Sequence, residues 1–272
     1  MNRDKWVIGD IHGCFATLMA LILKLPKGTK SEDIIYVGDM IDRGPDNRAV
    51  INYIRESGSK VVKGNHEDMM CDAYEEYIED NIEFEYSGWC RNGGNVCLEE
   101  YVDKYDMMDW EALKTDYEWF NSLPIAIIED QIIDTKGRKL LISHSHAAPY
   151  VDNYIKSINK VAEGLTEHIS EFMMVEYEHQ MTNSEQTILW NRKIPHNKDS
   201  KYFNIFGHTP IDNFINDKKY LTPEKVIVDT DIGYANIDSG CVYTKKHKEY
   251  RGKLTAISFP GLKVIQQENI DD

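Results

Sequence analysis

Residues that commonly bind metals follow four separate apolar runs of this sequence, each time directly after a glycine. The four segments read GDIHG, GDMIDRG, GNHED and GHTP. Their polar residues are Asp10, His12, Asp39, Asp42, Arg43, Asn65, His66 and His208. Glycine allows a sharp turn and a close approach of two backbones. Because ligands bind beyond the carboxyl ends of strands in open α/β sheets, we expect these side chains to converge at one place.

Aspartate, asparagine and histidine together suit divalent manganese, iron or zinc. Two aspartates with two or three histidines exceed what one open catalytic zinc site requires. They match a pair of ions about 3.5–4 Å apart that share one carboxylate, which activates water and clamps the oxygens of an in-line displacement at phosphorus. Arg43, directly after Asp42, adds a planar fork suited to phosphate oxygens.

Each motif alone has an ordinary structural explanation. The GNHE segment could start a helix, with Asn65 as the N-cap and Glu67 in the first turn. An adjacent aspartate and arginine, such as Asp42 and Arg43, often form a surface ion pair. All four motifs in order, each at the end of an apolar run, favour a metal site over a set of coincidences.

The elements that must position these residues can be outlined from apolar periodicity. The first 80 residues alternate short apolar runs at 6–8, 34–37 and 61–62 with helical patterns, which is typical of a mainly parallel α/β sheet. The helical patterns cover 15–25, the stretch from Pro45 to Glu56, and a stretch starting near His66. In the second half, strands are predicted at 124–130, 131–134, 139–143, 202–206, 225–228, 240–243 and 253–259. They suit a second sheet packed on the first.

No repeat or linker divides the 272 residues, so we predict a single domain over 1–272. Residues 160–190 have a helical pattern, and a helical cap over the site is expected around 150–200.

The charge of the chain bears on its partners. Lys and Arg number 31 and Asp and Glu 46, which gives a net charge of −15. This balance argues against nucleic-acid binding, which needs a basic face, and against docking on an anionic membrane. No apolar run is long enough to span a bilayer, and the first apparent strand starts too early to leave room for a signal peptide. Five cysteines are too few and odd in number for a disulfide framework, so we expect a cytoplasmic protein.

Taken together, the four motifs resemble the signature of the calcineurin-like metallophosphoesterases. The DRG ending and GNHE resemble the phosphoprotein phosphatase branch, and specifically the serine/threonine phosphatases of the bacterial and bacteriophage-lambda type. Further matching segments are WCRNGGNVCL at 89–98, LWNR at 189–192 and NIDSGCVY at 236–243. The resemblance implies the metallo-dependent phosphatase fold of the α/β (α+β) class, in which two mixed β-sheets pack as a β-sandwich flanked by helices.

The resemblance also implies roles for individual residues. Two metal ions are implied, with Mn²⁺ favoured and Fe or Zn as alternatives. Their ligands would be Asp10, His12, Asp39 (shared), Asn65, His144 and His208. His66 would be the general acid, oriented by Asp42, while Arg43, Arg192 and Asn65 would bind the phosphoryl group.

Two positions depart from the family pattern. ISHSHAAP offers two histidines where the family has one, and His144 is favoured over His146 because it ends an apolar run and has the usual spacing to Pro149. Lys63 stands where the family usually has arginine, so a bidentate contact to phosphate is lost there.

The function implied is a metal-dependent serine/threonine protein phosphatase that attacks phosphorus with a hydroxide held by the metals, without a phosphoenzyme. A symmetrical dinucleoside tetraphosphatase, whose family usually shows GNHD, is one alternative, and a non-catalytic phosphate-binding module is another. The expected partner is a phosphoprotein or phosphopeptide, and no regulatory subunit is expected. Nine acids between Glu67 and Glu85 are either a solvated helix face or a docking face for basic peptides.

Overall fold

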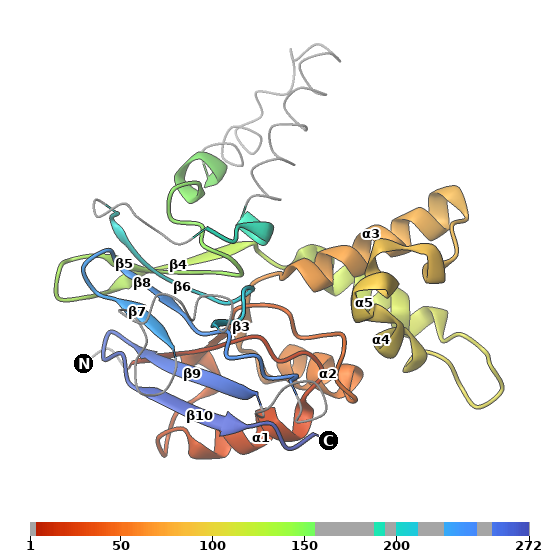
Figure 1. The fold of residues 1–272 in the computed structure, drawn as a ribbon, viewed down its shortest axis with the longest axis horizontal. Helices are drawn as coiled ribbons and strands as arrows, with labels where there is room; N and C mark the ends of the chain where they lie inside the picture. Colours follow the sequence, from red (N-terminus) through yellow and green to blue (C-terminus); the bar gives the residue numbers. More distant parts are fainter. Residues whose placement is uncertain (1–3, 156–187, 194–199, 212–225, 244–251, 272) are drawn as a thin grey trace, which may run out of the picture.

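The computed structural model describes residues 4–155, 188–193, 200–211, 226–243 and 252–271. Two five-stranded sheets form its centre, as Figure 1 shows. The α-helices that lie wholly within the described residues are α1 (Phe15–Lys24), α2 (Asn47–Ser57), α3 (Asn65–Asp80), α4 (Asn95–Glu99) and α5 (Trp110–Ser122). Within the part of the chain described, no helix is both long enough and apolar enough to cross a membrane.

The first sheet has the strand order β10-β9-β1-β2-β3. Strands β1, β2 and β3 are parallel, and β9 and β10 extend the sheet in antiparallel fashion beyond β1. The strand bounds are β1 (Lys5–Ile8), β2 (Ile34–Tyr36), β3 (Lys60–Val61), β9 (Lys253–Phe259) and β10 (Val264–Glu268). The parallel βαβαβ beginning is therefore as the sequence predicts.

The second sheet has the strand order β4-β5-β6-β8-β7. Strands β5, β6 and β8 are parallel, while β4 and β7 are antiparallel edge strands. Their bounds are β4 (Ala126–Ile133), β5 (Lys139–Ser143), β6 (Tyr202–Phe206), β7 (Ile227–Asp229) and β8 (Tyr234–Asn236). Both sheets are mixed, as expected.

The alternating directions of side chains along β1 explain how the helices and the two sheets are layered. Trp6 and Ile8 on β1 face a core shared with α1 and α2, whereas Val7 faces the other way. Val7 packs in a second core with side chains of both sheets, including Ile142 of β5 and Ile205 of β6. Because successive strand residues point to opposite faces, β1 joins the helix layer on one side and the second sheet on the other. The predicted sandwich of two sheets flanked by helices is confirmed.

Some element predictions were wrong. Residues 240–243 form a turn, and the strand of that region is β8 instead. The two strands predicted at 124–130 and 131–134 are one strand, β4, with an irregular register between Glu129 and Ile133. Strand β10 was not predicted. Most of the stretch 160–190 and of the expected cap at 150–200 lies outside the described residues.

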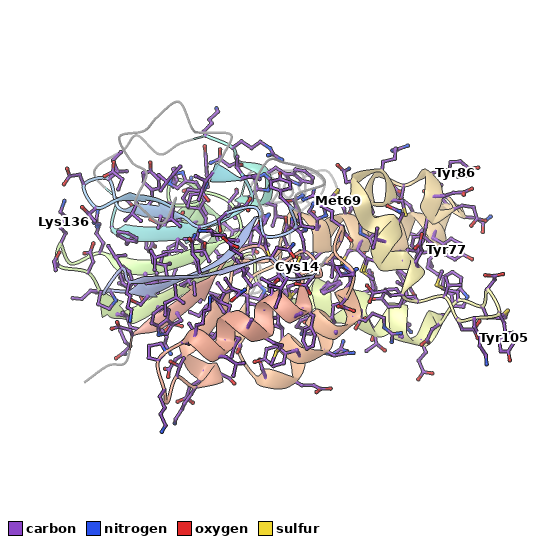
Figure 2. All side chains as sticks on the ribbon, turned by 60° about the horizontal axis from the view of Figure 1, so that its bottom comes forward. Cys14, Met69, Tyr77, Tyr86, Tyr105 and Lys136 are labelled. Carbon is purple, nitrogen blue, oxygen red and sulfur yellow. The ribbon has the colours of Figure 1, made fainter. Side chains whose placement is uncertain are left out.

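Helices α3, α4 and α5 form a lobe that extends to one side of the sandwich (Figure 1). An aromatic stack holds its outer part together, with the rings of Tyr77 and Trp110 4.8 Å apart and those of Tyr77 and Phe84 5.1 Å apart. Tyr77, Tyr86 and Tyr105 lie at this end of the molecule in Figure 2. The first turns of α3 are buried against the sandwich.

A candidate dinuclear metal centre

The predicted site residues occupy tight turns after the strands. Five of them have positive φ: His12 (50°), Asp39 (48°), Asp42 (78°), Arg43 (71°) and His208 (69°). Among the described residues only three other non-glycine residues do so. This left-handed region costs a non-glycine residue about 1–3 kcal/mol, and such strain concentrates at functional sites.

The glycines at these turns let the functional groups approach one another. A Cβ placed on Gly207 would lie 1.8 Å from Oδ1 of Asp10, and one placed on Gly64 would lie 2.4 Å from Oδ1 of Asp39. No side chain larger than hydrogen fits in either place without displacing the carboxylate. The close approach expected from the glycine pattern is therefore present in the fold.

One group of ligand atoms gathers beside Asp39 at the ends of β5 and β6. Nε2 of His144 and Nδ1 of His208 each lie 2.8 Å from Oδ1 of Asn65 and 3.1 Å from each other. Oδ1 of Asp39 lies 3.3 Å from Nε2 of His144. Nδ1 of His144 donates to the carbonyl of Val37 at 2.9 Å. In that tautomer its Nε2 carries the lone pair and faces the other ligand atoms.

A second group shares the other oxygen of the same carboxylate. Oδ2 of Asp39 lies 3.6 Å from Nε2 of His12, whose Nδ1 donates to the carbonyl of Ile41 at 2.8 Å. Asp10 is adjacent: its Oδ2 accepts the backbone N–H of His208 at 3.0 Å, and its Oδ1 is buried with no hydrogen-bond partner among the described residues. Asp39 thus stands between two sets of donor atoms.

These residues fit a pair of metal ions. Several nitrogen and oxygen lone pairs converge in a buried space, and no group in the described part of the chain donates a hydrogen bond to the buried Oδ1 of Asp10. A buried acceptor without a partner is costly, and a cation among these atoms would remove that cost. Carboxylate, amide oxygen and imidazole are ligands suited to manganese, iron and zinc.

Geometry alone also groups His66 with His12 and Asp39, but its bonding is different. Nδ1 of His66 lies 2.5 Å from Oδ2 of Asp42, and its Nε2 is 4.0 Å from Oδ2 of Asp39. The Asp42 carboxylate also accepts from the indole N–H of Trp89, at 2.9 and 3.0 Å. His66 is therefore held by Asp42 beside the ligand cluster, with Nε2 facing inward.

Arg43 and Arg192, the two arginines of the predicted site, lie near the cluster of ligand atoms. The Arg43 guanidinium donates to Nε2 of His12 and to Nε2 of His66, each at 2.8 Å. Arg192 is exposed, and its charge is close enough to contribute to lowering the pKa of His208. Trp190, two residues before it, packs edge-on against His208 with ring centroids 5.9 Å apart. Two cations therefore border the cluster.

The electrostatics of the cluster are dominated by burial and by Asp39. Burial opposes protonation of His144, but the Asp39 carboxylate outweighs it and raises the pKa of His144 to about 9. Burial, aided by the His144 charge, lowers the pKa of His208 to about 2. Burial, with Asp238 nearby, raises the pKa of Asp10 well above its ordinary value. A bound cation would take the place of the proton on His144, since metal ligation requires neutral imidazole.

The structure separates the two neighbouring histidines. His144 faces the cluster, whereas His146 packs against the ring of Phe206 with centroids 5.5 Å apart. Lys63 is buried, with Nζ 3.3 Å from the side-chain oxygens of both Asp68 and Asn121. Its ammonium group thus lies between α3 and α5.

Sequence reasoning missed the roles of Glu67 and Trp89. Glu67 was assigned to the acidic stretch, but it is fully buried, and its carboxylate accepts backbone N–H groups of Gly64, Asp39 and Met40 at 2.8–2.9 Å. It therefore ties the Asp39 turn to the start of α3, where Gly64 rather than Asn65 is the N-cap. The only signal was the glutamate of GNHE, three residues into the helix from its cap.

Comparison with known proteins identifies the class. The family model described as "Calcineurin-like phosphoesterase" matches residues 5–235. The chain belongs to this family, as its motifs predict, and the family consists of hydrolases.

Among the relatives, serine/threonine-protein phosphatase 1 of Salmonella typhimurium is 39% identical over 34% of this chain and 40% of its own length. Serine/threonine-protein phosphatase 2 of Escherichia coli is 32% identical over 58% of this chain and 72% of its own length. A symmetrical bis(5'-nucleosyl)-tetraphosphatase of Photorhabdus laumondii is 28% identical over 55% of this chain and 46% of its own length. The chain thus spans about half the length of several of these relatives.

Solved structures show the same fold. A protein serine/threonine phosphatase from Saccharomyces cerevisiae superposes with a TM-score of 0.53 at 15% identity, covering 99% of this chain and 81% of that one. A structure assigned as a diadenosine tetraphosphatase superposes with the same TM-score of 0.53 at 17% identity, covering 99% and 95%. At these identities the likeness concerns the fold alone.

Proposed function

We propose that this chain is a metal-dependent phosphomonoesterase that acts as a serine/threonine protein phosphatase. The observation that carries the proposal is the position of Asp39, whose two oxygens face separate sets of donors that include His12 on one side and His144 on the other. One carboxylate shared by two metal positions is the arrangement of enzymes that displace a group at phosphorus.

The metal ligands in this proposal divide around the shared carboxylate. Asp10 and His12 would hold one ion, and Asn65, His144 and His208 the other, with Asp39 contributing to both. When bound, two such ions supply charge neutralisation of the phosphoryl oxygens and lower the pKa of water. Manganese fits this oxygen-rich set, as do iron and zinc.

The remaining residues would act on the substrate. His66, held by Asp42 at 2.5 Å, is placed to give a proton from Nε2 to the leaving alkoxide of serine or threonine. Such proton donation typically accelerates a reaction about 10²–10⁴-fold. Arg43 and Arg192 would bind the non-bridging phosphoryl oxygens, and Arg43 would exchange its bonds to His12 and His66 for bonds to substrate.

A symmetrical dinucleoside tetraphosphatase is the second candidate, because relatives with that name match up to 55% of this chain. It would use the same metal ligands on a phosphoanhydride. The glutamate of GNHE and the LWNR segment favour the protein phosphatase.

A side-by-side assay tests the proposal. The purified chain with added Mn²⁺ is given a phosphoserine peptide and diadenosine tetraphosphate at equal concentrations. We expect a larger kcat/KM for the peptide. A larger value for the dinucleotide would assign the second function, and hydrolysis of neither would indicate a non-catalytic module.

A further inference from the structure

The segment 89–94 belongs to the helical lobe, yet it contacts the turn that carries Asp42 and Arg43. The turn itself is strained, since both residues have positive φ. The N–H of Asp42 donates to Oδ1 of Asn47 at 2.6 Å, and the N–H of Arg43 donates to the carbonyl of Gly93 at 3.2 Å. Strained turns persist only when surrounding structure holds them, so the lobe contributes directly to this one.

Trp89 is the side chain of that segment that reaches Asp42, the partner of the proposed proton donor His66. It is fully buried, and its indole N–H lies 2.9 and 3.0 Å from the two oxygens of Asp42. Oδ2 of Asp42 is also the atom that accepts from His66. A carboxylate held from one side by an indole N–H can keep only a narrow range of orientations for the imidazole on its other side.

Two glycines of the segment leave room for the side chains of Trp89 and Arg43. A Cβ on Gly94 would lie 2.4 Å from the indole nitrogen of Trp89, and a Cβ on Gly93 would lie 2.8 Å from Cγ of Arg43. Gly93 has a φ of 104°, which a larger residue rarely adopts. Trp89 and Arg43 can therefore occupy their positions only because residues 93 and 94 have no side chain.

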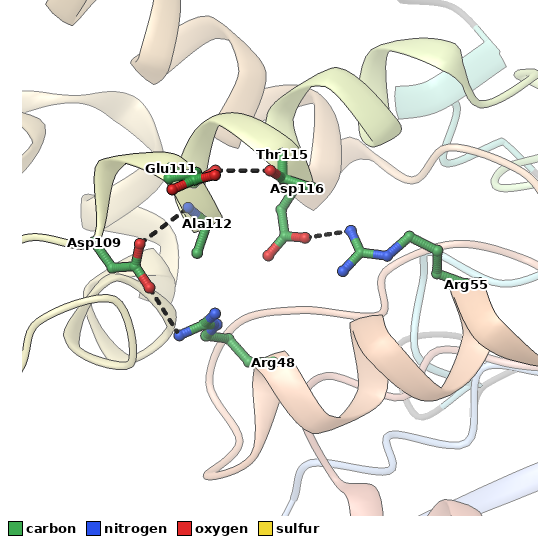
Figure 3. A pocket seen from close by; sticks show the side chains of 7 residues that line it. All are labelled: Arg48, Arg55, Asp109, Glu111, Ala112, Thr115 and Asp116. Atoms are coloured by element: carbon green, nitrogen blue, oxygen red, sulfur yellow. Dashed lines mark hydrogen bonds and ion pairs between the residues drawn. The ribbon is translucent and has the colours of Figure 1, made fainter.

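The lobe is anchored to the same turn by a second route. The carboxylate of Glu100, just after α4, accepts from the backbone N–H groups of Asn47 and Arg48 at the start of α2. Between α2 and α5 a pocket of about 290 Å³ is crossed by ion pairs, Arg55 with Asp116 at 2.5 Å and Arg48 with Asp109 at 3.9 Å (Figure 3). Because the charges of both arginines are neutralised by acidic partners, we interpret the pocket as a contact between the lobe and the sandwich and not as an anion-binding site.

We propose that Trp89 is a positioning residue for the hydrolytic reaction: its indole N–H orients Asp42 so that His66 presents Nε2 to the leaving group. This inference rests on the proposed phosphomonoesterase function. Trp89 touches neither the substrate nor the metal ligands in this scheme. It acts only through Asp42. By way of the segment 89–94, the helical lobe therefore helps to position His66 and Asp42 for proton donation.

The test is Trp89→Phe, which keeps an aromatic ring in the core and removes the N–H donor. Loss of a hydrogen bond to a charged group predicts a fall of about tenfold or more in kcat for a phosphoserine peptide. KM and the number of bound metal ions should not change. For 4-nitrophenyl phosphate, whose leaving group needs no proton, kcat should fall less than about threefold.

Two controls separate positioning from a general loss of structure. Trp119→Phe removes a partly buried indole that packs against the same core. Among the described residues Trp119 has no hydrogen bond to Asp42, so this change should leave the ratio of the two kcat values unchanged. In a His66→Asn background, Trp89→Phe should cause no further loss, because two residues that act through one group are not additive. If Trp89→Phe fails to fold, replacing the Trp89 indole with a benzothiophene isostere removes the donor and retains the shape.

The outcomes distinguish this inference from the proposed function. An unaltered protein that hydrolyses neither ester would overturn both. If the unaltered protein is active, three results would overturn only the positioning role of Trp89. Removing the indole donor could leave kcat unchanged, lower kcat equally for the peptide and the aryl ester, or lower kcat further in the His66→Asn background.

Discussion

Oδ1 of Asp39 lies 3.3 Å from Nε2 of His144, although the two residues come from different sheets of the sandwich. The other oxygen of Asp39 faces His12, which follows β1 in the same sheet as Asp39. This one carboxylate therefore joins donors contributed by both sheets. In the proposed role of shared metal ligand, Asp39 would couple the occupancy of the two metal positions, and removing it should affect both.

Asp39→Ala tests that coupling. We expect the variant to lose both metal ions, because each proposed position would lose an anionic ligand. Metal content measured by inductively coupled plasma mass spectrometry after dialysis checks this. Asp130→Ala, at an exposed residue paired with Lys139, is the matched control and should retain the full content. Two ions per chain in Asp39→Ala would show that the carboxylate is not shared.

His66→Asn should separate proton donation from metal binding. The variant keeps a polar side chain but has no ring nitrogen to protonate the leaving group. We expect unchanged metal content and a fall of about 10²–10⁴-fold in kcat on phosphoserine peptides. Aryl esters should be affected much less. Equal losses on alkyl and aryl esters would argue that His66 serves as a ligand, in line with its place near His12 and Asp39.

The neighbouring histidines provide a matched pair. His144→Gln removes a nitrogen from the Asn65 and His208 group, so metal affinity should fall by at least about tenfold. His146→Gln changes a side chain that packs against Phe206 and should leave metal affinity nearly unchanged. Isothermal titration of the metal-free proteins with Mn²⁺ gives both values. The reverse ranking would assign the ligand role to His146.

His146 should also make the stability of the metal-free protein depend on pH. Burial lowers the pKa of His146 to about 4, from an ordinary value of 6.5. Between these values the unfolded chain binds more protons at this residue than the folded chain, so its contribution to stability is full above pH 6.5 and is lost as the pH falls toward 4. The total is about 3 kcal/mol or less.

Urea unfolding measured at several pH values between 4 and 7 detects this contribution. We expect the free energy of unfolding of the unaltered protein to decrease more steeply with falling pH than that of His146→Gln. Both proteins are measured with a chelator present, so that metal release does not contribute. Identical slopes would show that His146 titrates normally in the folded chain.

Gly207→Ala tests the close approach between β6 and Asp10. The new methyl group would lie 1.8 Å from Oδ1 of Asp10, so the carboxylate or the turn must move. We expect weaker metal binding and a loss of stability of about 1–3 kcal/mol. Gly88→Ala is the control, since no atom of the described residues lies within 4 Å of its Cβ position. Metal titration and thermal unfolding of the two variants provide the comparison.

Local sequence was sufficient for much of the fold. The alternation of strands and helices in the first 80 residues predicted β1, β2 and β3 with α1 and α2, because apolar periodicity records which face each element buries. It was insufficient for β8 and β10. Residues 240–243 have a strand-like composition but form a turn, whereas Tyr234–Asn236 is a strand because β6 and β7 pair with it. Strand identity there depends on neighbours that are distant in sequence.

The same division applies to the site. The motifs were enough to predict the family and the set of candidate ligands, since a glycine followed by Asp, His or Asn at a strand end is a local chemical pattern. Three relations became visible only in the folded chain: which oxygen of Asp39 faces which histidine, the inward direction of His144 rather than His146, and the hydrogen bond from Trp89 to Asp42. These relations join atoms of residues up to 105 positions apart, as for Asp39 and His144. These contacts form only when packed sheets and helices bring the residues within a few ångströms of one another, as at 3.3 Å for Asp39 and His144 and 2.9 Å for Trp89 and Asp42.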